Sequence, residues 1–225
     1  MIQEYRVADF VANFVKDIGI GHVFLLPGGG CMHLVDAVGK CKDLEVVACL
    51  HEQAATISAE AYSRINEKPG VAIVTSGPGA TNAITGMVGA WIESVPLIVI
   101  SGQVKTSDML NGAPLRQNGV QEVDIVSMVK TITKYAVTVK NPKDIRSVME
   151  QAIHHATTGR AGPVLIDIPL DIQGAPINIA TLKTWTKRGK IKDKDVTDSE
   201  MKKLLKLVSS AQRPLFLAGH GIRLS

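Results

Sequence analysis

Short apolar runs alternate along the chain with segments of helical periodicity, and this alternation limits the possible folds more than any other feature. Strands that are apolar on both faces occur in parallel sheets covered by helices on both sides. The pattern therefore predicts an α/β fold, a doubly wound six-stranded parallel sheet with helices on both faces. The six predicted strands are 22–26 (HVFLL), 44–50 (LEVVACL), 70–76 (GVAIVTS), 96–102 (PLIVISG), 134–140 (KYAVTVK) and 163–169 (PVLIDIP).

The segments between these runs carry apolar residues at helical spacing or are rich in small residues. A longer polar loop is expected over 103–122. The expected helices are the one from Val7 to a C-cap at Gly19, and those over 32–41, 51–65, about 80–94, about 122–131 and 142–158.

Composition excludes several classes of protein. The chain has 225 residues, 45% of them hydrophobic and 20% charged, which fits one or two globular domains. No apolar run approaches the roughly 18 residues that span a bilayer, and no secretory signal opens the chain. The three cysteines, Cys31, Cys41 and Cys49, are odd in number and lack CxxC spacing. We therefore expect a cytoplasmic protein without disulfides, structural zinc or a membrane partner.

The net charge of +4 comes from one basic stretch. Residues 1–181 hold 14 Lys and Arg against 17 Asp and Glu, whereas 182–206 hold nine against four. A nucleic-acid patch needs basic residues on a folded face, often with aromatic residues among them, and only Trp185 lies nearby. We interpret the stretch as a solvated linker and helix, and we expect no nucleic-acid partner.

The chain divides into one domain and the beginning of another. Residues 1–175 hold the predicted sheet, 176–197 have the composition of a linker, and 198–225 resemble the start of a second α/β domain. In that last segment we expect a helix capped by Asp198 and a strand over 214–219. A lone helix and strand bury no core, so we interpret this segment as the truncated start of a central domain.

Ligands of such sheets bind beyond the carboxyl ends of the strands, so the turns there are candidate sites. Glu52 begins a predicted helix, where an acid also serves simply to complement the helix dipole. The glycine turns at 27–30 and 77–79 match neither a Walker motif nor a complete dinucleotide fingerprint, and Ser76 is not in a GxSxG elbow. His154 and His155 project about 100° apart on one helix, and we interpret both as structural.

Taken together, these turns carry a more specific signal. Pro27-Gly28-Gly29, HEQAA (51–55), TSGPGATN (75–82), Gly102-Gln103-Val104 and QEVD (121–124) occur in this order, each at or after a predicted strand end. The constellation resembles the N-terminal, pyrimidine-binding domain of thiamine-diphosphate enzymes of the acetolactate synthase and pyruvate oxidase family. The resemblance covers about residues 1–175, and its implied fold is the thiamine-diphosphate-binding fold.

The resemblance implies a role for each matching residue. Glu52 matches the catalytic glutamate, which hydrogen-bonds N1′ of the cofactor's aminopyrimidine and so promotes loss of the thiazolium C2 proton. Gln121 matches a glutamine near the reacting centre. The remaining matches bind the cofactor: Thr75, Pro78 and Asn82 line the pyrimidine pocket, and Pro27, Gly28 and Gly29 form the loop that closes over it.

Some residues depart from the pattern of acetolactate synthases. Val120 stands where Phe is usual, the run Trp91–Ser94 replaces one ending in Asp-Ser, and Cys31 replaces a small residue or Thr. These departures concern the substrate rather than the cofactor. The loop over 103–122 lacks the adjacent His pair of simple pyruvate decarboxylases, and Glu52 excludes the glyoxylate carboligases.

The resemblance also implies what this chain lacks. Family members hold Mg²⁺ and the diphosphate through a GDG motif in another domain, and these 225 residues contain no such motif or metal-ligand cluster. The family's active site forms between this domain and the diphosphate-binding domain of a second subunit. We therefore expect thiamine diphosphate and Mg²⁺ as cofactors, a 2-keto acid as substrate, and no activity of this chain alone. Binding of FAD is left open.

A homodimer or homotetramer is expected through the helices near 51–65 and 79–94, whose many small residues allow close helix approach. The same residues also suit packing of each helix on its own sheet. Two other functions remain as alternatives: a subunit of a naturally split thiamine-diphosphate enzyme such as a keto acid decarboxylase, and a non-catalytic interaction module with the same fold.

Overall fold

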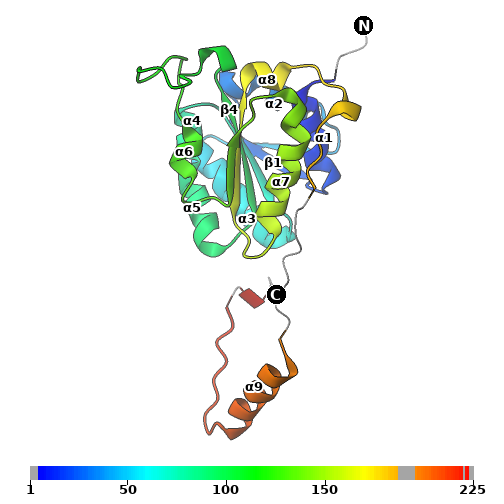
Figure 1. Cartoon of the computed structure of the whole chain (residues 1–225), viewed down its shortest axis with the longest axis vertical. Coiled ribbons are helices and arrows are strands. Elements are labelled where there is room, and N and C mark those ends of the chain that lie inside the picture. The colour runs from blue at the N-terminus through cyan, green and yellow to red at the C-terminus, as the bar shows by residue number, and fades with distance from the viewer. Residues whose placement is uncertain (1–4, 187–195, 220, 223–225) are drawn as a thin grey trace. The chain divides into compact units, whose positions relative to one another are not determined.

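A six-stranded sheet, parallel at every strand pairing, forms the centre of the larger unit (Figure 1). The structure is a computed structural model that describes residues 5–186, 196–219, 221 and 222. The strand order is β2-β1-β3-β4-β6-β5, which confirms the doubly wound six-stranded parallel sheet. The strands are β1 (His22–Leu25), β2 (Glu45–Ala48), β3 (Gly70–Val74), β4 (Leu97–Gln103), β5 (Tyr135–Thr138) and β6 (Pro163–Pro169).

Helices cover both faces of the sheet and enclose two apolar cores. The alternation of side chains along β4 divides them: Ile98 and Ile100 face one core, and Leu97 and Val99 face the other. The first core is closed by α1 (Val7–Asp17), α2 (Met32–Lys40), α7 (Ile145–Thr157) and α8 (Leu170–Gly174). The second is closed by α3 (Glu52–Asn66), α4 (Pro78–Asn82), α5 (Ile84–Glu93) and α6 (Ile125–Val129).

Several predicted helices differ in extent from the observed ones. The helix expected over 80–94 is divided at Ala83, whose amide bonds to the carbonyl of Ala80 rather than one residue further back. The helix expected over 122–131 is shortened to α6, and α8 follows β6 where no helix was predicted. Among its described residues, the larger unit also has four 3₁₀ turns: η1 (Gly29–Cys31), η2 (Thr106–Asp108), η3 (Pro142–Asp144) and η4 (Ile179–Thr181).

The chain divides into two compact units, Met1–Trp185 and Thr186–Ser225. In the second unit, α9 (Asp198–Ser210) is capped by Thr197, which forms a reciprocal capping box with Glu200, rather than by Asp198 as predicted. The strand predicted over 214–219 is wrong: these residues have no regular secondary structure, and Phe216 is 76% exposed. A strand needs a neighbour to pair with, and no described residue supplies one. None of the described helices combines the length and apolar character needed to cross a membrane.

The helix α3 lies unusually close to β3 at one glycine. A Cβ atom on Gly70 would lie 1.8 Å from the carbonyl oxygen of Ala59, a backbone atom that cannot turn away. Gly70 also donates its amide hydrogen bond to Pro96, and Ser63 donates to the same carbonyl. The absence of a side chain at Gly70 therefore allows α3 to pack this closely on the start of β3.

Gly70→Ala is expected to lower the free energy of unfolding by about 3 kcal/mol, since the helix must move off the strand to admit a methyl group. Gly39→Ala is the matched control, because nothing lies within 4 Å of its Cβ position on α2. There the free energy of unfolding should stay constant or rise by up to about 1 kcal/mol. Urea denaturation of the two variants measures both values, and equal effects would contradict the close contact.

Candidate functional site

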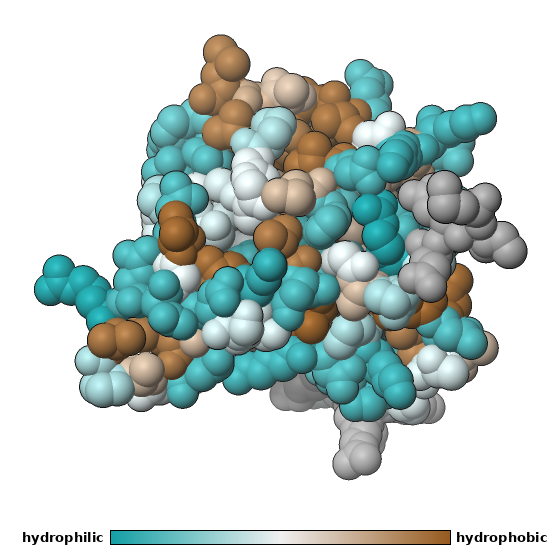
Figure 2. All heavy atoms as spheres, turned by 90° about the horizontal axis from the view of Figure 1, so that it is seen from above, coloured by the Kyte–Doolittle hydropathy of each residue, from teal (hydrophilic) through white to brown (hydrophobic). Residues whose placement is uncertain are grey.

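The carboxyl ends of β1 and β3 form the point at which the chain reverses its direction of travel across the sheet. From β1 the chain runs outward to β2, and it then returns to β3 on the other side of β1. Loops diverge at such a point and leave a crevice beyond the strand ends. Figure 2 views the molecule from above, onto the edge where the strands end, and shows separate hydrophobic groups on a largely hydrophilic surface.

The glycine loop after β1 is held by contacts with three other segments. The Gly30 amide donates to Oγ1 of Thr75 at 3.0 Å, and a Cβ on Gly28 would lie 2.4 Å from the Cβ of Thr75. The Gly30 carbonyl packs against Gly102 so closely that a Cβ there would lie 2.0 Å away. The same carbonyl accepts a 2.7 Å hydrogen bond from the side chain of Gln173, which is fully buried. The loop backbone is therefore fixed at the switch point.

Glu52 is the buried carboxylate of this region. It is the first residue of α3, after the N-cap His51, whose Nδ1 accepts the amide of Gln53. Only 7% of Glu52 is exposed. Its Oε2 accepts a 3.0 Å hydrogen bond from the side chain of Asn82 at the end of α4, whereas no described residue donates to Oε1. A Cβ on Gly79 would lie 3.0 Å from that Oε1, so the glycine leaves the oxygen open.

Cys31 ends the 3₁₀ turn of the glycine loop and is buried in the first core. The thiol is fully buried, 3.5 Å from the Gly28 carbonyl, with Thr75 and the Glu52 carboxylate near enough to affect its titration. Burial raises the pKa of the Cys31 thiol, so the thiol is neutral at physiological pH. It therefore packs as a small uncharged side chain of the first core.

Gln121 lies at the end of a loop whose shape depends on its neighbour. Glu122 accepts the backbone amides of Leu110, Asn118 and Gly119, which ties the loop into a closed form. Gln121 itself adopts a left-handed backbone (φ 62°), and its carbonyl packs against Gly77. Gln121 as a whole is exposed.

The structure thus places some of the predicted site residues in direct contact with one another and leaves others exposed. Gly28 contacts Thr75, and Asn82 bonds to Glu52. Gln121 reaches the turn at Gly77 through its carbonyl group and its Cβ. The other three, Pro27, Gly29 and Pro78, are exposed at the rim. The roles assigned to all eight residues remain predictions.

Asp167 is a second buried carboxylate at this edge, on β6. It accepts hydrogen bonds from Ser101, Gln103 and Thr138 and adjoins a cavity of about 390 Å³. Burial raises the pKa of Asp167 to about 6, against the opposing effect of the three donors. The Gln103 side chain also donates to the carbonyl of Val123, so this network anchors the loop that carries Gln121.

The paired histidines lie in the last turn of α7 rather than in its middle, and both contact aromatic rings. The ring of His154 lies 4.8 Å from that of Trp185, and the ring of His155 stacks on Tyr135 at 5.3 Å. Within the part of the chain that the structure describes, no three His, Cys, Asp or Glu side chains gather in a way that could hold a metal ion.

The chain matches one known family by its sequence. The family model described as thiamine pyrophosphate enzyme, N-terminal TPP binding domain, matches residues 5–128. That range contains the glycine loop, Glu52, Asn82 and Gln121. It ends before β5 and β6.

Curated relatives match nearly all of this chain. The acetolactate synthase large subunit of Buchnera aphidicola subsp. Acyrthosiphon pisum is 39% identical over 219 residues, which are 96% of this chain and 37% of the relative. That of Lactococcus lactis subsp. lactis is 34% identical over 97% of this chain and 37% of its own length. The mitochondrial acetolactate synthase of Schizosaccharomyces pombe is 38% identical over 90% of this chain and 31% of its own length. The chain therefore spans about a third of the length of these relatives.

Asp167→Asn is expected to change how stability depends on pH. The unfolded carboxyl ionises near pH 4, and the folded one near pH 6. Between these values the folded state binds more protons, so this group's contribution to the free energy of unfolding falls as pH rises, by roughly 3 kcal/mol at most. The stability difference between wild type and variant, measured by urea denaturation from about pH 4 to about pH 7, should shift by that amount. A constant difference would contradict it.

Proposed function

The chain belongs to the thiamine pyrophosphate enzyme family through its N-terminal TPP binding domain, and we propose that it forms the pyrimidine-binding part of a 2-keto acid carboligase or decarboxylase resembling the acetolactate synthase large subunit. The observation that carries the proposal is the buried Glu52 carboxylate, bonded to Asn82 on one oxygen and open on the other. We propose residues 1–175 as this domain, 176–197 as a linker and 198–225 as the start of the central domain.

The residues present fit an aminopyrimidine ring. The ring needs a carboxyl group that shares a proton with N1′, and Oε1 of Glu52 has no donor among the described residues. It also needs backbone that approaches closely, and Gly28 and Gly79 are places where a Cβ would meet Thr75 at 2.4 and 2.6 Å. When bound, thiamine diphosphate would supply a thiazolium that stores the electrons released by decarboxylation.

Each residue then has a defined task. Glu52 holds or releases a proton at the ring nitrogen, in surroundings where little water competes for it. Asn82 fixes the carboxylate, because its hydrogen bond to Oε2 leaves Oε1 directed elsewhere. Thr75 positions the glycine loop, whose Pro27, Gly28 and Gly29 border the ring. Pro78 lines the pocket beside it, and the exposed Gln121 is available to the 2-keto acid.

The rest of the proposed enzyme lies outside these residues. Mg²⁺ and the diphosphate would be held by a separate domain of a second subunit, and FAD binding is left open. Three free cysteines fit a reducing cytoplasm.

We propose that a second copy of the chain covers the outer face of α3. Ala54, Ile57, Ala61 and Ile65 repeat at helical spacing on that face, and all four are exposed, Ile65 by 82%. Small and apolar side chains in such a stripe suit the close packing of an identical helix in a homodimer, or in a homotetramer built from it.

Glu52→Gln in the full-length protein is expected to slow exchange of the C2 proton of bound thiamine diphosphate in deuterated solvent by about 10²–10⁴-fold. Glutamine has the same shape, so packing is kept, but it carries no negative charge to stabilise the protonated ring. Turnover of 2-keto acids should fall with the exchange rate.

Glu60→Gln is the matched control for this variant. Glu60 is a buried carboxylate on the same helix, and it pairs with Arg64 at 2.6 Å rather than with the site. Exchange in this variant should equal that of the wild type. Equal exchange in Glu52→Gln and in the wild type would show that Glu52 merely complements the helix dipole.

Ile57→Asp is expected to convert the dimer to a monomer, since a charge in an apolar helix interface is left unpaired and desolvated. Met128→Asp is the control, because Met128 is similarly exposed (51% against 46% for Ile57) but lies on α6. Sedimentation velocity of the two variants at equal concentration measures the difference. A monomeric wild type, or a dimer retained by Ile57→Asp, would be the contrary result.

A further inference from the structure

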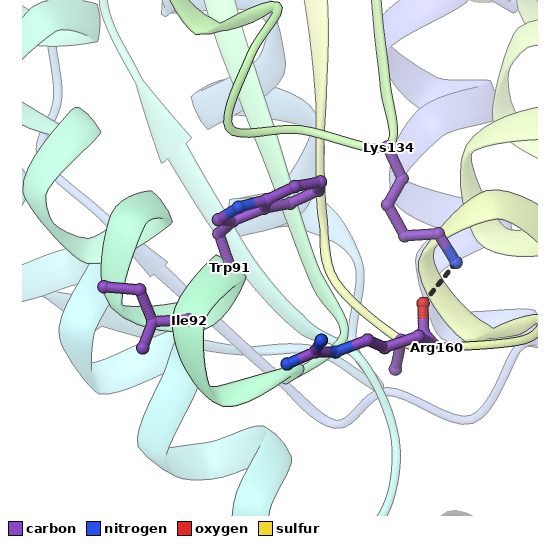
Figure 3. A pocket seen from close by; sticks show the side chains of 5 residues that line it. Trp91, Ile92, Lys134 and Arg160 are labelled. Carbon is purple, nitrogen blue, oxygen red and sulfur yellow. Dashed lines mark hydrogen bonds between the residues drawn. The ribbon is translucent and has the colours of Figure 1, made fainter.

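A separate pocket of about 330 Å³ opens at the opposite edge of the sheet (Figure 3). Its lining comes from the last turn of α5 (Trp91, Ile92), the residue before β5 (Lys134) and the turn before β6 (Arg160, Ala161). Because every strand is parallel, these segments meet at the amino ends of the strands, away from the glycine loop and Glu52. The volume falls at the small end of the range for ligand sites.

The apolar part of the pocket is a flat and partly exposed surface. Trp91 is 41% exposed and Ile92 is 63% exposed, and both project from the end of α5 in Figure 3. A planar apolar group could stack on the indole face.

The polar part is a guanidinium held in place. Nε of Arg160 donates to Oγ of Ser94 at 2.6 Å, and its two terminal nitrogens bond to no acceptor among the described residues. Lys134 cannot replace it, because its Nζ donates at 2.6 Å to the carbonyls of both Thr158 and Arg160 (Figure 3 draws the second of these bonds). Burial lowers the pKa of Lys134, which further weakens it as a partner for an anion.

We propose that this pocket binds a small monocarboxylate with a flat apolar body, whose ring stacks on Trp91 and whose carboxylate bonds to the terminal nitrogens of Arg160. None of the described residues that line the pocket carries a carboxylate, whereas two of them are cationic. The charge of the site selects among anions: one guanidinium with two parallel donors matches a singly charged, bidentate carboxylate. A phosphate monoester carries nearly two charges and would leave one without a partner. The proposal is independent of the chemistry assigned to Glu52.

Tryptophan fluorescence of the full chain with Trp185→Phe tests the site, because Trp91 is then the single tryptophan. Benzoate should change the emission in a saturable way. Benzamide, which has the same shape but no charge, should bind at least about tenfold more weakly, as expected for loss of a charged hydrogen-bonded pair. Inorganic phosphate should bind more weakly than benzoate.

Arg160→Gln in the same background should weaken benzoate binding at least about tenfold, whereas Arg116→Gln, an identical change in the loop at the other edge, should leave it unchanged. Arg160→Lys keeps the positive charge but loses the paired donors of the guanidinium, so it should recover only part of the affinity for benzoate. Ligand-observed NMR with the unsubstituted chain checks the result if Trp185→Phe fails to fold. The proposal would be overturned if benzamide bound as well as benzoate, if phosphate bound more tightly, or if no saturable signal appeared. It would also be overturned if the signal disappeared as protein concentration rose, because a second copy would then cover the pocket.

Discussion

The contact between the glycine loop after β1 and the turn after β3 is the constraint on which the site depends. These strands are neighbours in the sheet, and the loops after them leave in opposite directions. The Gly30 amide bonds to Thr75, and Gly28 packs on the same side chain with no room for a Cβ. Thr75 thereby joins the loop to the turn that leads into α4 and Asn82. This contact also affects the position of the Glu52 carboxylate, because Asn82, which follows the turn after β3, donates a hydrogen bond to it.

Most of the fold was predictable from the sequence because burial on both faces leaves a strong signal. The six apolar runs became six parallel strands, and Glu52 began its helix as the residue order suggested. The prediction of a strand over 214–219 was wrong, although this segment is as apolar as the runs that form strands. A strand is defined by its neighbour, and an apolar run alone does not say whether a neighbour exists. The same limit explains why Thr197 rather than Asp198 caps α9, since either side chain suits the position.

The parts of the site that the sequence did not indicate depend on long-range packing. Gln173 bonds to Gly30 across 143 positions, and nothing near Gln173 in the chain marks it as a partner of the glycine loop. Glu122 organises its loop through three backbone amides, a pattern visible only when the loop is closed. Cys31 stood out only as a departure from the family, whereas the structure buries it in the first core against the carbonyl of Gly28. In each case the residue type was visible and its partner was not.

The strand order has a consequence for how this fold can be shortened. β6 enters the sheet between β4 and β5, although it comes last along the chain. A fragment that ends at residue 128, where the family match ends, would therefore lose β5 and β6 together and leave β4 with an open side. All seven residues of β4 are buried, and such a strand at an edge is a template for pairing with other chains. The smallest fragment in which β4 keeps both neighbouring strands thus continues at least to the end of β6. It must extend to Gln173 to keep the hydrogen bond from that side chain to the Gly30 carbonyl.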